Sequence, residues 1–283
     1  MTFQINSSVL NEALKSLNRV VPTRTTLPIL SCVLFKSDGG KLNVRSTNLE
    51  VSMEYNLDAE INEPINIAIP ISKILNVTSS LKREDLNFEI SQDYKIKITT
   101  KFGEYNIMGV SSEDFPNKTE KIKESSLSFS TSDLEEIIDY TINSCSTDDL
   151  KPALQGILLS FNEAKTTFVS TDGHRLSKVD IEKNGPASKN LILPVKFFKL
   201  VQSFLSENNQ IDFILSENHA EVFFKGINIS TRLIQDSYPD YEKVIPQSNE
   251  KRVVIDNKKM IESLKRMSSF SSKKTKQATL FIN

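Results

Sequence analysis

The sequence repeats itself at a fixed offset, and this repetition constrains the fold more than any other property of the chain. Four pairs of identical residues are each 124 residues apart: Pro28 and Pro152, Leu30 and Leu154, Thr47 and Thr171, and Pro70 and Pro194. Apolar positions keep the same offset, since Phe3, Ile5, Leu10, Leu14, Val33 and Leu34 correspond to Leu127, Phe129, Leu134, Ile138, Ile157 and Leu158. A fixed period indicates one structural unit that is used more than once.

A third unit begins near Val253 and is predicted to be incomplete. Its apolar positions Val253, Ile255, Met260, Leu264 and Leu280 follow the pattern of the second unit. Three full units would need roughly 370 residues, so about 90 residues of the third are expected to be lacking. The predicted domains are residues 1–120, residues 121–247, and an incomplete third domain at 248–283. Polar linkers are expected at about Asn117 to Ser126 and Gln247 to Arg252.

Composition bounds the class of protein. The 283 residues include 38% apolar residues, which is enough for packed cores, and carry a net charge of −1. No apolar run is long enough for a membrane span, and the N-terminus lacks a basic and apolar leader, so we expect a cytoplasmic protein. The near-neutral charge argues against a sequence-specific DNA-binding protein. Cys32 and Cys145 lie in apolar stretches without metal-ligand spacing, which favours buried free thiols.

Each unit reads as α+β with two helices. The first helix is expected from about Ser8 to Val21, and its counterpart follows Ser132, which with Glu135 matches a capping box. Second helices are expected after Pro70 and Pro194. The inward side chains of the first helix would be Val9, Leu10, Ala13, Leu14, Leu17 and Val21. Period-two alternation predicts strands, for example at Val51 to Leu57, so each domain should consist of two similar half-domains with both helices on one side of the sheets.

The sequence contains little that points to catalysis. It has no phosphate-binding glycine loop, no metal-ligand spacing and no nucleophile elbow, and we expect neither a cofactor nor a metal. Ser170, Asp172 and His174 lie in STDGHRL, but residues two apart on one turn rarely align for proton transfer. Asp172 corresponds by the repeat to Asn48, and an Asx side chain that closes a turn onto its own backbone explains both. The first unit continues with Leu49 and Glu50 and has no histidine at the position of His174, and this difference between the units gives His174 some weight as a functional residue.

Seven segments of the chain resemble the bacterial DNA polymerase III beta subunit, the sliding clamp. These segments are RTTLPILSCVLF (24–35), RSTNLE (45–50), EDFP (113–116), KPALQGILL (151–159), STDGHRLS (170–177), LPVKFFKLV (193–201) and SYPDYEKVIP (237–246). The resemblance implies repeated DNA-clamp domains, each with two helices packed on antiparallel sheets. It implies a processivity factor of DNA replication that encircles duplex DNA without reading its sequence, as a head-to-tail homodimeric ring of three domains per subunit. It also implies a non-catalytic protein.

The resemblance assigns three sets of residues. The implied peptide groove, which would receive linear motifs of the replicative polymerase, the clamp loader and repair polymerases, consists of Leu154, Thr171, Gly173, His174, Arg175, Leu176, Pro239, Lys243 and Val244. The family also builds this groove from C-terminal residues that this chain lacks. The implied lumen cations are Arg24, Lys15, Arg19, Lys73, Lys196 and Lys199, with Lys258 and Lys265 in the third unit. The implied ring interface consists of Lys73, Val77, Tyr105 and Ile107. Without a finished third domain, the ring is not expected to close.

Two alternatives stay open at this point. The chain could be a peptide-binding scaffold that does not encircle DNA, or an enzyme that uses Asp172 and His174.

Acidic residues weaken the case for a cationic lumen. Glu135, Glu136 and Asp139 lie on the helix after Ser132 and place negative charge on one of the predicted lumen walls.

Overall fold

The structure, a computed structural model, describes residues 1–118, 125–162, 164–183, 190–205, 210–272 and 277–281. The chain divides into two compact units, Met1–Tyr238 and Pro239–Asn283, and each is described by itself. The predicted boundary between residues 120 and 121, and most of the first predicted linker, lie outside the described residues.

The first half of the larger unit contains two helices, a short 3-10 turn and nine strands. They are β1 (Thr2–Asn6), α1 (Ser7–Leu17), η1 (Pro28–Ser31), β2 (Cys32–Asp38), β3 (Lys41–Thr47), β4 (Val51–Leu57), β5 (Glu60–Ile61), β6 (Asn66–Pro70), α2 (Ile71–Ser80), β7 (Asp85–Ile90), β8 (Lys95–Thr100) and β9 (Gly103–Met108).

The second half repeats this order in its described residues, apart from an additional 3-10 turn, η2, and the position equivalent to β5, which lies outside those residues. Its elements are β10 (Ser125–Ser130), α3 (Thr131–Thr141), η2 (Ile142–Ser144), η3 (Pro152–Gln155), β11 (Gly156–Phe161), β12 (Thr166–Thr171), β13 (Leu176–Ile181), β14 (Asn190–Pro194), α4 (Val195–Gln202), β15 (Gln210–Leu215), β16 (His219–Phe224) and β17 (Ile227–Arg232). The first helices, α1 and α3, begin and end 124 residues apart, as do strands β6 and β14 and strands β9 and β17. The predicted α+β fold with a repeated order of elements is confirmed.

One sheet runs through both halves of the larger unit. Its eight strands follow the order β10-β15-β16-β17-β4-β3-β2-β6. Strands β17 and β4, which come from different halves, pair antiparallel from Ile227 opposite Tyr55 to Thr231 opposite Val51. A five-stranded sheet (β5-β1-β7-β8-β9) and a four-stranded sheet (β13-β12-β11-β14) complete the unit. We call the β17–β4 pair the seam, because it joins the two halves through backbone hydrogen bonds.

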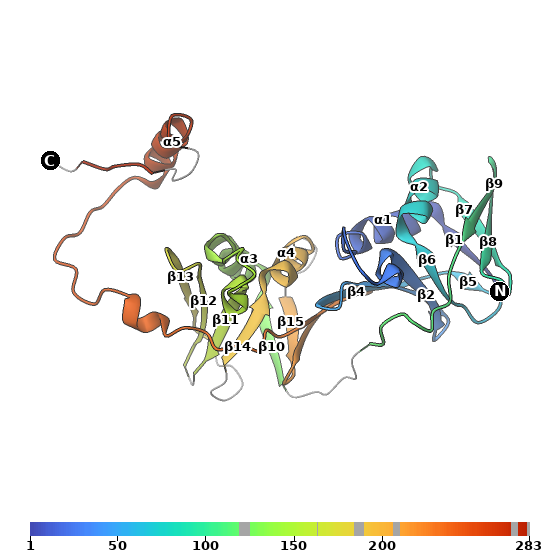
Figure 1. Cartoon of the computed structure of the whole chain (residues 1–283), viewed down its shortest axis with the longest axis horizontal. Coiled ribbons are helices and arrows are strands. Elements are labelled where there is room, and N and C mark those ends of the chain that lie inside the picture. Colours follow the sequence, from blue (N-terminus) through green and yellow to red (C-terminus); the bar gives the residue numbers. More distant parts are fainter. Residues whose placement is uncertain (119–124, 163, 184–189, 206–209, 273–276, 282–283) are drawn as a thin grey trace. The chain divides into compact units, whose positions relative to one another are not determined.

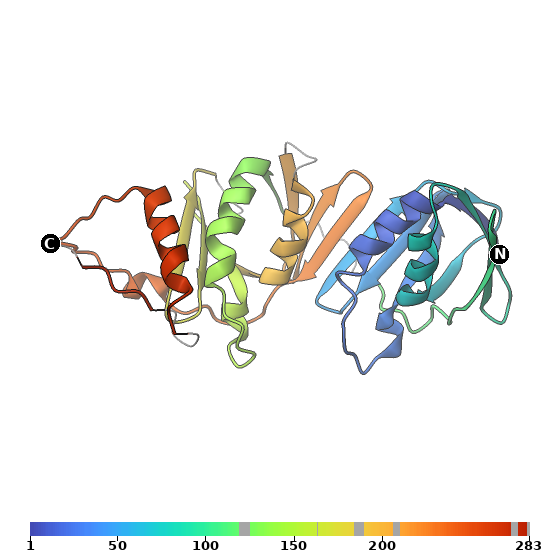
Figure 2. The ribbon, with the colours of Figure 1, turned by 90° about the horizontal axis from the view of Figure 1, so that it is seen from above.

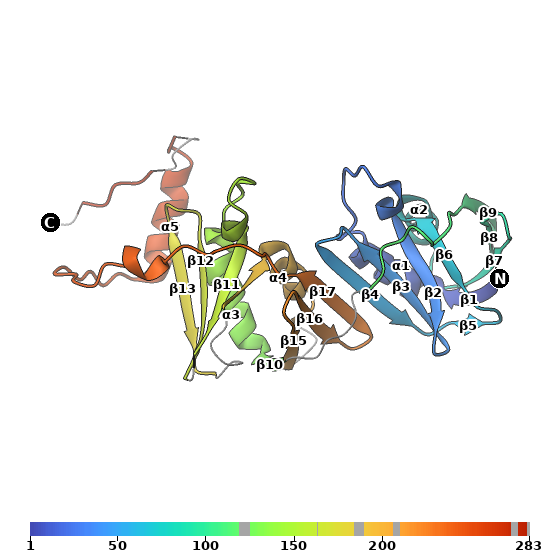
Figure 3. The same ribbon diagram turned by 60° about the horizontal axis from the view of Figure 1, so that its bottom comes forward.

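The four helices of the larger unit lie on one side of the sheets, as predicted (Figures 1 and 2). We call this side the helix face and the opposite side, which Figure 3 brings forward, the sheet face. Helix α1 packs through Leu10, Ala13, Leu14 and Leu17, all at most 1% exposed. Leucine and alanine at these spacings form the apolar stripe that an amphipathic helix buries.

Two details of the predicted helices are wrong. The helix α1 ends at Leu17 rather than near Val21, and Val9 is 44% exposed, because it lies at the edge of the apolar stripe. The cap of α3 is Ser130, whose side chain accepts a hydrogen bond from the backbone N–H of Asp133, so the predicted capping box at Ser132 does not form. The chain enters the helix directly from strand β10, and Ser130 is the residue in the extended conformation that a cap requires.

Both cysteines are buried free thiols, as predicted, with Cys32 4% and Cys145 8% exposed. The predicted turns at Asn48 and Asp172 are also confirmed. The Asn48 Oδ1 accepts hydrogen bonds from the backbone N–H groups of Glu50 and Val51, and the Asp172 Oδ1 accepts them from His174 and Arg175. The two halves therefore share this turn down to individual atoms.

The smaller unit contains a 3-10 turn, η5 (Tyr241–Val244), and the helix α5 (Asn257–Ser268). The helix that the third repeat predicts around Met260 and Leu264 is present, but the strand expected at Val253 to Ile255 is not. A strand needs a partner for its backbone N–H and C=O groups, and no described strand lies in this unit. None of its described residues is buried.

Candidate functional site

A cationic pocket of about 270 Å³ opens next to the seam and is lined by residues from both halves of the larger unit. Its charged residues are Arg19, which follows helix α1, and Lys196 and Lys199 on helix α4. Its other lining residues are Val20, Asn48, Val51 and Leu200. Three residues predicted to contact DNA are thus brought together from positions up to 180 residues apart in the sequence.

One of the three cations forms an ion pair across the two halves. The Lys196 Nζ lies 3.1 Å from Glu50 Oε2, and both side chains are partly exposed to solvent. Glu50 is held in place from two directions, since its N–H donates to Asn48 Oδ1 and its carbonyl accepts a hydrogen bond from the backbone N–H of Arg232. Lys199 and Arg19 are exposed and form no ion pair with any described residue. The pocket therefore keeps two cations that can bind an anion such as a phosphate.

The remaining predicted cations lie elsewhere. Lys15 is in the last turn of α1, Arg24 is in the loop after α1, and Lys73 is on α2, all exposed to solvent. Lys258 and Lys265 are exposed on α5, in the smaller unit. On α3 the acidic side chains of Glu135, Glu136 and Asp139 are exposed, and Asp139 accepts a hydrogen bond from Gln202 Nε2. Three of the six predicted cations of the larger unit therefore line the pocket beside the seam, and the other three lie along α1, the loop after it and α2.

The segment Thr171 to Leu176 forms a tight turn between strands β12 and β13. The Thr171 Oγ1 donates to the Arg175 carbonyl, and the Arg175 Nε lies 3.0 Å from Asp172 Oδ2. Partial burial acts to raise the pKa of Asp172, but the N–H groups of Arg175 and His174 and the guanidinium of Arg175 hold this pKa below its ordinary value. Asp172 is thus a structural anion, and His174 and Arg175 project at an exposed corner.

The other residues of the predicted peptide groove fall into both units. Leu154 lies in the 3-10 turn before β11 and is 9% exposed, while Leu176 begins β13 and is half-buried. Pro239, Lys243 and Val244 belong to the smaller unit and are exposed there. The residues of the β12–β13 turn therefore lie together in the larger unit. Pro239, Lys243 and Val244 belong to the smaller unit.

The four residues of the predicted ring interface lie on α2 and β9. Lys73 is exposed and Val77 half-buried on α2, whereas Tyr105 is half-buried and Ile107 is 7% exposed on β9. The side chains of Ile107 and Tyr105 face the core of their sheet. Strand β9 pairs only with β8 among the described strands, so its other side is an open sheet edge.

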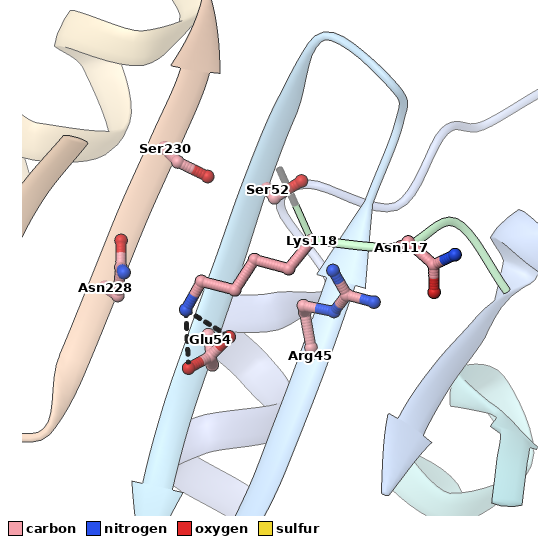
Figure 4. A pocket seen from close by; sticks show the side chains of 7 residues that line it. All are labelled: Arg45, Ser52, Glu54, Asn117, Lys118, Asn228 and Ser230. Carbon is pink, nitrogen blue, oxygen red and sulfur yellow. Dashed lines mark hydrogen bonds and ion pairs between the residues drawn. The ribbon is translucent and has the colours of Figure 1, made fainter. Parts of the chain in front are cut away.

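A polar cluster on the sheet face of the seam was missed by the sequence analysis (Figure 4). The Lys118 Nζ lies 2.9 Å from Glu54 Oε2, and Glu54 lies opposite Asn228 in the strand pairing. Beside them, the Arg45 guanidinium donates to the Pro116 carbonyl and lies 5.2 Å from the centre of the Phe115 ring. The cavity between these side chains has a volume of about 30 Å³, which is enough to hold a water molecule.

This cluster fastens the chain after β9 onto the sheet, and Arg45, Glu54 and Lys118 also line an adjoining pocket of about 240 Å³. Burial lowers the pKa of Arg45, and the charge of Glu54 opposes that effect. The sequence carries no local signal of the cluster, because polar and apolar residues alternate in the strand KLNVRST and Arg45 stands where a solvent-facing residue is expected. Glu50 could have been found through the repeat, which aligns it with His174.

No helix in the described part of the chain is long and apolar enough to cross a membrane. In the same part of the chain, no group of three or more His, Cys, Asp or Glu side chains is arranged to hold a metal ion.

The chain matches two family models that together extend over most of its length. The model of the N-terminal domain of the DNA polymerase III beta subunit matches residues 1–119, and the model of its central domain matches residues 128–240. The beta sliding clamp of Pseudomonas aeruginosa is 27% identical over 278 residues, with 97% of this chain and 76% of that protein covered. The beta sliding clamp of Treponema pallidum is 27% identical over 269 residues, with 93% of this chain and 72% of that protein covered.

Solved structures show the same fold. The Pseudomonas aeruginosa DnaN sliding clamp bound to griselimycin superposes with a TM-score of 0.88 at 27% identity, covering 98% of this chain and 76% of that one. The DNA polymerase sliding clamp of Bacillus subtilis has a TM-score of 0.90 at 21% identity, covering 96% of this chain and 75% of that one. The fold is that of the DNA sliding clamps. The chain belongs to the family of the bacterial DNA polymerase III beta subunit.

Proposed function

We propose that this chain acts as a DNA sliding clamp of the replicative polymerase and that the helix face is the side turned towards duplex DNA. The pocket of Arg19, Lys196 and Lys199 carries this proposal, because it gathers cations from two clamp domains at one place on that face. A clamp holds DNA by topology and needs only weak phosphate contacts, which suits a chain with a net charge of −1. Lys15, Arg24 and Lys73 would add contacts further along the face.

The domain organisation forms part of the same proposal. Residues 1–120 and 121–247 would be two clamp domains, and residues 248–283 would begin a third. A head-to-tail ring would use Lys73, Val77, Tyr105 and Ile107 at the open edge beside α2. The protein would work in the cytoplasm, as an accessory subunit without catalytic activity.

The DNA proposal is tested by the salt dependence of binding to a short duplex. Lys199→Gln should lower the affinity and reduce the slope of log affinity against log salt by about 0.9, the contribution of one phosphate contact. Lys36→Gln is the matched control, because it removes the same charge from a different place. Lys36 lies on strand β2 and lines another pocket, together with Phe115 and Arg45. Equal slopes for Lys199→Gln and the unchanged protein would contradict the assignment of the pocket.

The second part of the proposal is capture of linear peptide motifs from the replicative polymerase, the clamp loader and repair polymerases. The turn from Thr171 to Leu176 supports it, since its side chains at His174 and Arg175 are exposed while Thr171 and Asp172 fix the backbone. Rigid turns that present polar groups beside an apolar side chain suit recognition of an extended peptide. Leu154, Gly173 and Leu176 would supply the wall in the larger unit, and Pro239, Lys243 and Val244 the remainder.

This peptide site is tested with a short peptide that carries a glutamine followed by an aliphatic and an aromatic residue. Leu176→Ala should weaken binding roughly tenfold, because loss of about 60 Å² of apolar contact costs about 1.5 kcal/mol. Lys15→Ala, on α1, should leave binding unchanged. Calorimetric titration of both variants measures the difference, and equal affinities would mean that the turn is not the peptide site.

The enzyme alternative has little support in this geometry. The Ser170 hydroxyl is buried and donates to the Thr141 carbonyl, so it cannot attack a substrate. Asp172 is committed to two backbone N–H groups and to Arg175, and its lowered pKa makes it a poor base.

A further inference from the structure

The pocket of about 240 Å³ on the sheet face has a buried floor and an exposed rim. The floor includes Leu34 and Arg45, each 7% exposed, and Phe115, which is 4% exposed. Lys36 and Asn66 lie at the rim and are exposed to solvent. The pocket therefore presents an apolar surface and a buried cation to a molecule that enters from solvent.

Most of the hydrogen-bonding capacity of Arg45 is unused. Among the residues that the structure describes, its guanidinium donates one hydrogen bond, from Nη2 to the Pro116 carbonyl, and it lies beside the Phe115 ring (Figure 4). The neighbouring carboxylate of Glu54 is engaged elsewhere, since both of its oxygens accept hydrogen bonds from Lys118 Nζ, at 3.0 and 2.9 Å. A guanidinium with unused N–H groups matches the planar, two-oxygen geometry of a carboxylate.

The charges around the pocket favour a ligand with a single negative charge. Three cations and two anions line it, which leaves an excess of one positive charge; they are Lys36, Arg45, Lys118, Asp38 and Glu54. The exposed carboxylate of Asp38 would repel a second negative charge on a ligand, so a monocarboxylate fits better than a phosphate dianion.

The second half contains the repeat equivalent of this pocket without its positive charge. That pocket, of about 480 Å³, is lined by Leu158, which corresponds to Leu34. Its charged lining residues are both acidic, Glu217 and Asp236. At the position of Arg45 the second half has Val169, which is fully buried. A valine in the equivalent strand shows that the fold does not require a cation there, and burying one is costly.

We infer that the 240 Å³ pocket is a binding site for a small organic monocarboxylate. The carboxylate pairs with the Arg45 guanidinium, and the short apolar body of the acid lies against Leu34 and Phe115. Lys36 attracts the anion at the rim. The volume is below the range of about 300–1,000 Å³ that is usual for drug-sized ligands, so the acid has only a few carbon atoms.

Titration of the full chain with butyrate, followed by NMR at constant ionic strength, tests this inference. The Arg45 Nε–H resonance should shift and saturate with a dissociation constant on the order of 1 mM, a reasonable affinity for so small a ligand. Butyramide has the same shape without the charge and should bind at least roughly tenfold more weakly, because it loses the charge-assisted hydrogen bonds.

Two variants locate the binding. Arg45→Lys keeps the positive charge but loses the planar donor group, and it should bind butyrate roughly tenfold more weakly. Lys36→Gln removes an exposed charge at the rim and should weaken binding roughly two- to fivefold. Circular dichroism checks that each variant is folded, and the exposed Lys36 decides the matter if Arg45→Lys does not fold.

The matched control is Lys225→Gln, which removes the same charge from the exposed turn between β16 and β17, outside the pocket. It should bind butyrate like the unchanged protein. The absence of a saturating shift at tenfold the expected dissociation constant would overturn the inference. So would butyramide binding as tight as that of butyrate, or equal losses of affinity in Lys225→Gln and Lys36→Gln.

Discussion

Cys145 shows how burial alone sets the chemistry of one side chain. Its thiol is 8% exposed and lies between the carbonyl oxygens of Thr141 and Gly156. Desolvation raises the pKa of this thiol to about 11, against the opposing effects of the Lys199 charge and a hydrogen bond with Ser170. The thiol is therefore protonated at neutral pH and unreactive, in agreement with a structural role.

This raised pKa predicts a loss of stability in alkali. Between pH 9 and pH 11 the unfolded chain releases the Cys145 proton while the folded chain retains it, so the free energy of unfolding falls as pH rises. Between pH 8 and pH 10 the contribution should be on the order of 1 kcal/mol. Urea unfolding of the unchanged protein and of Cys145→Ala at both pH values measures it. A Cys145→Ala variant that loses as much stability as the parent would contradict the prediction.

Single residues could be predicted from the sequence where the repeat supplied a comparison. Asn48 and Asp172 were assigned to the same turn because both are Asx residues at equivalent positions, and the structure confirms the hydrogen bonds. Glu50, Arg45 and Lys118 were not recognised, because their partners are far away in the sequence. The sequence alone does not show which strands lie side by side.

At the scale of elements, the start of helix α3 gives a sharp test. The Ser130 Oγ accepts a hydrogen bond from the Asp133 N–H, so Ser130→Ala should lower the free energy of unfolding by about 1 kcal/mol. Ser132→Ala, the matched control in the same turn, should change it by less than about 0.5 kcal/mol. Thermal or urea unfolding of the two variants compares them. Equal losses would mean that the capping group is shared or misassigned.

Helices and strands could be predicted from the sequence where the periodicity of apolar residues was strong within a short segment. Pro70 and Pro194 marked the starts of α2 and α4 correctly, because proline fits the entry to a helix and cannot continue one. The strand expected at Val253 to Ile255 is not formed, because a strand depends on a partner strand elsewhere in the chain. Alternating apolar residues make a strand only when another strand satisfies their backbone groups.

At the scale of the whole molecule, the two units should differ in stability. Helix α5 has no buried residue, and a helix of 12 residues is marginally stable by itself in water. Backbone amides of Ile261 to Leu264 should therefore exchange hydrogen within about one order of magnitude of the rate of an unfolded peptide. Amides of the central strand β3, by contrast, should be protected by close to the full free energy of unfolding. Hydrogen exchange by mass spectrometry measures both, and equal protection would contradict the prediction.

The seam could not be predicted from the sequence, although the repeated α+β order of elements on either side of it could. The apolar patterns that predict helices and strands come from residues close together in the sequence. Strands β4 and β17 are separated by about 170 residues, and neither strand's sequence indicates which strand it pairs with. The helix-face pocket depends on the seam as well, since Arg19 and Lys196 come together only because the two sheets are one.

The seam also determines how the molecule responds to mechanical load. Its hydrogen bonds run perpendicular to the strands, so a pull that separates the domains within the plane of the sheet stretches all of them at once, and the joint is stiff in tension. Sliding one strand along the other is resisted as well, because Ile229 and Met53 would leave the core. Bending about the strand axis breaks no backbone hydrogen bond, but it is opposed by the single apolar core that continues through both halves and includes Met53 and Ile229. The joint is therefore held by backbone hydrogen bonds against tension and by side-chain packing against bending.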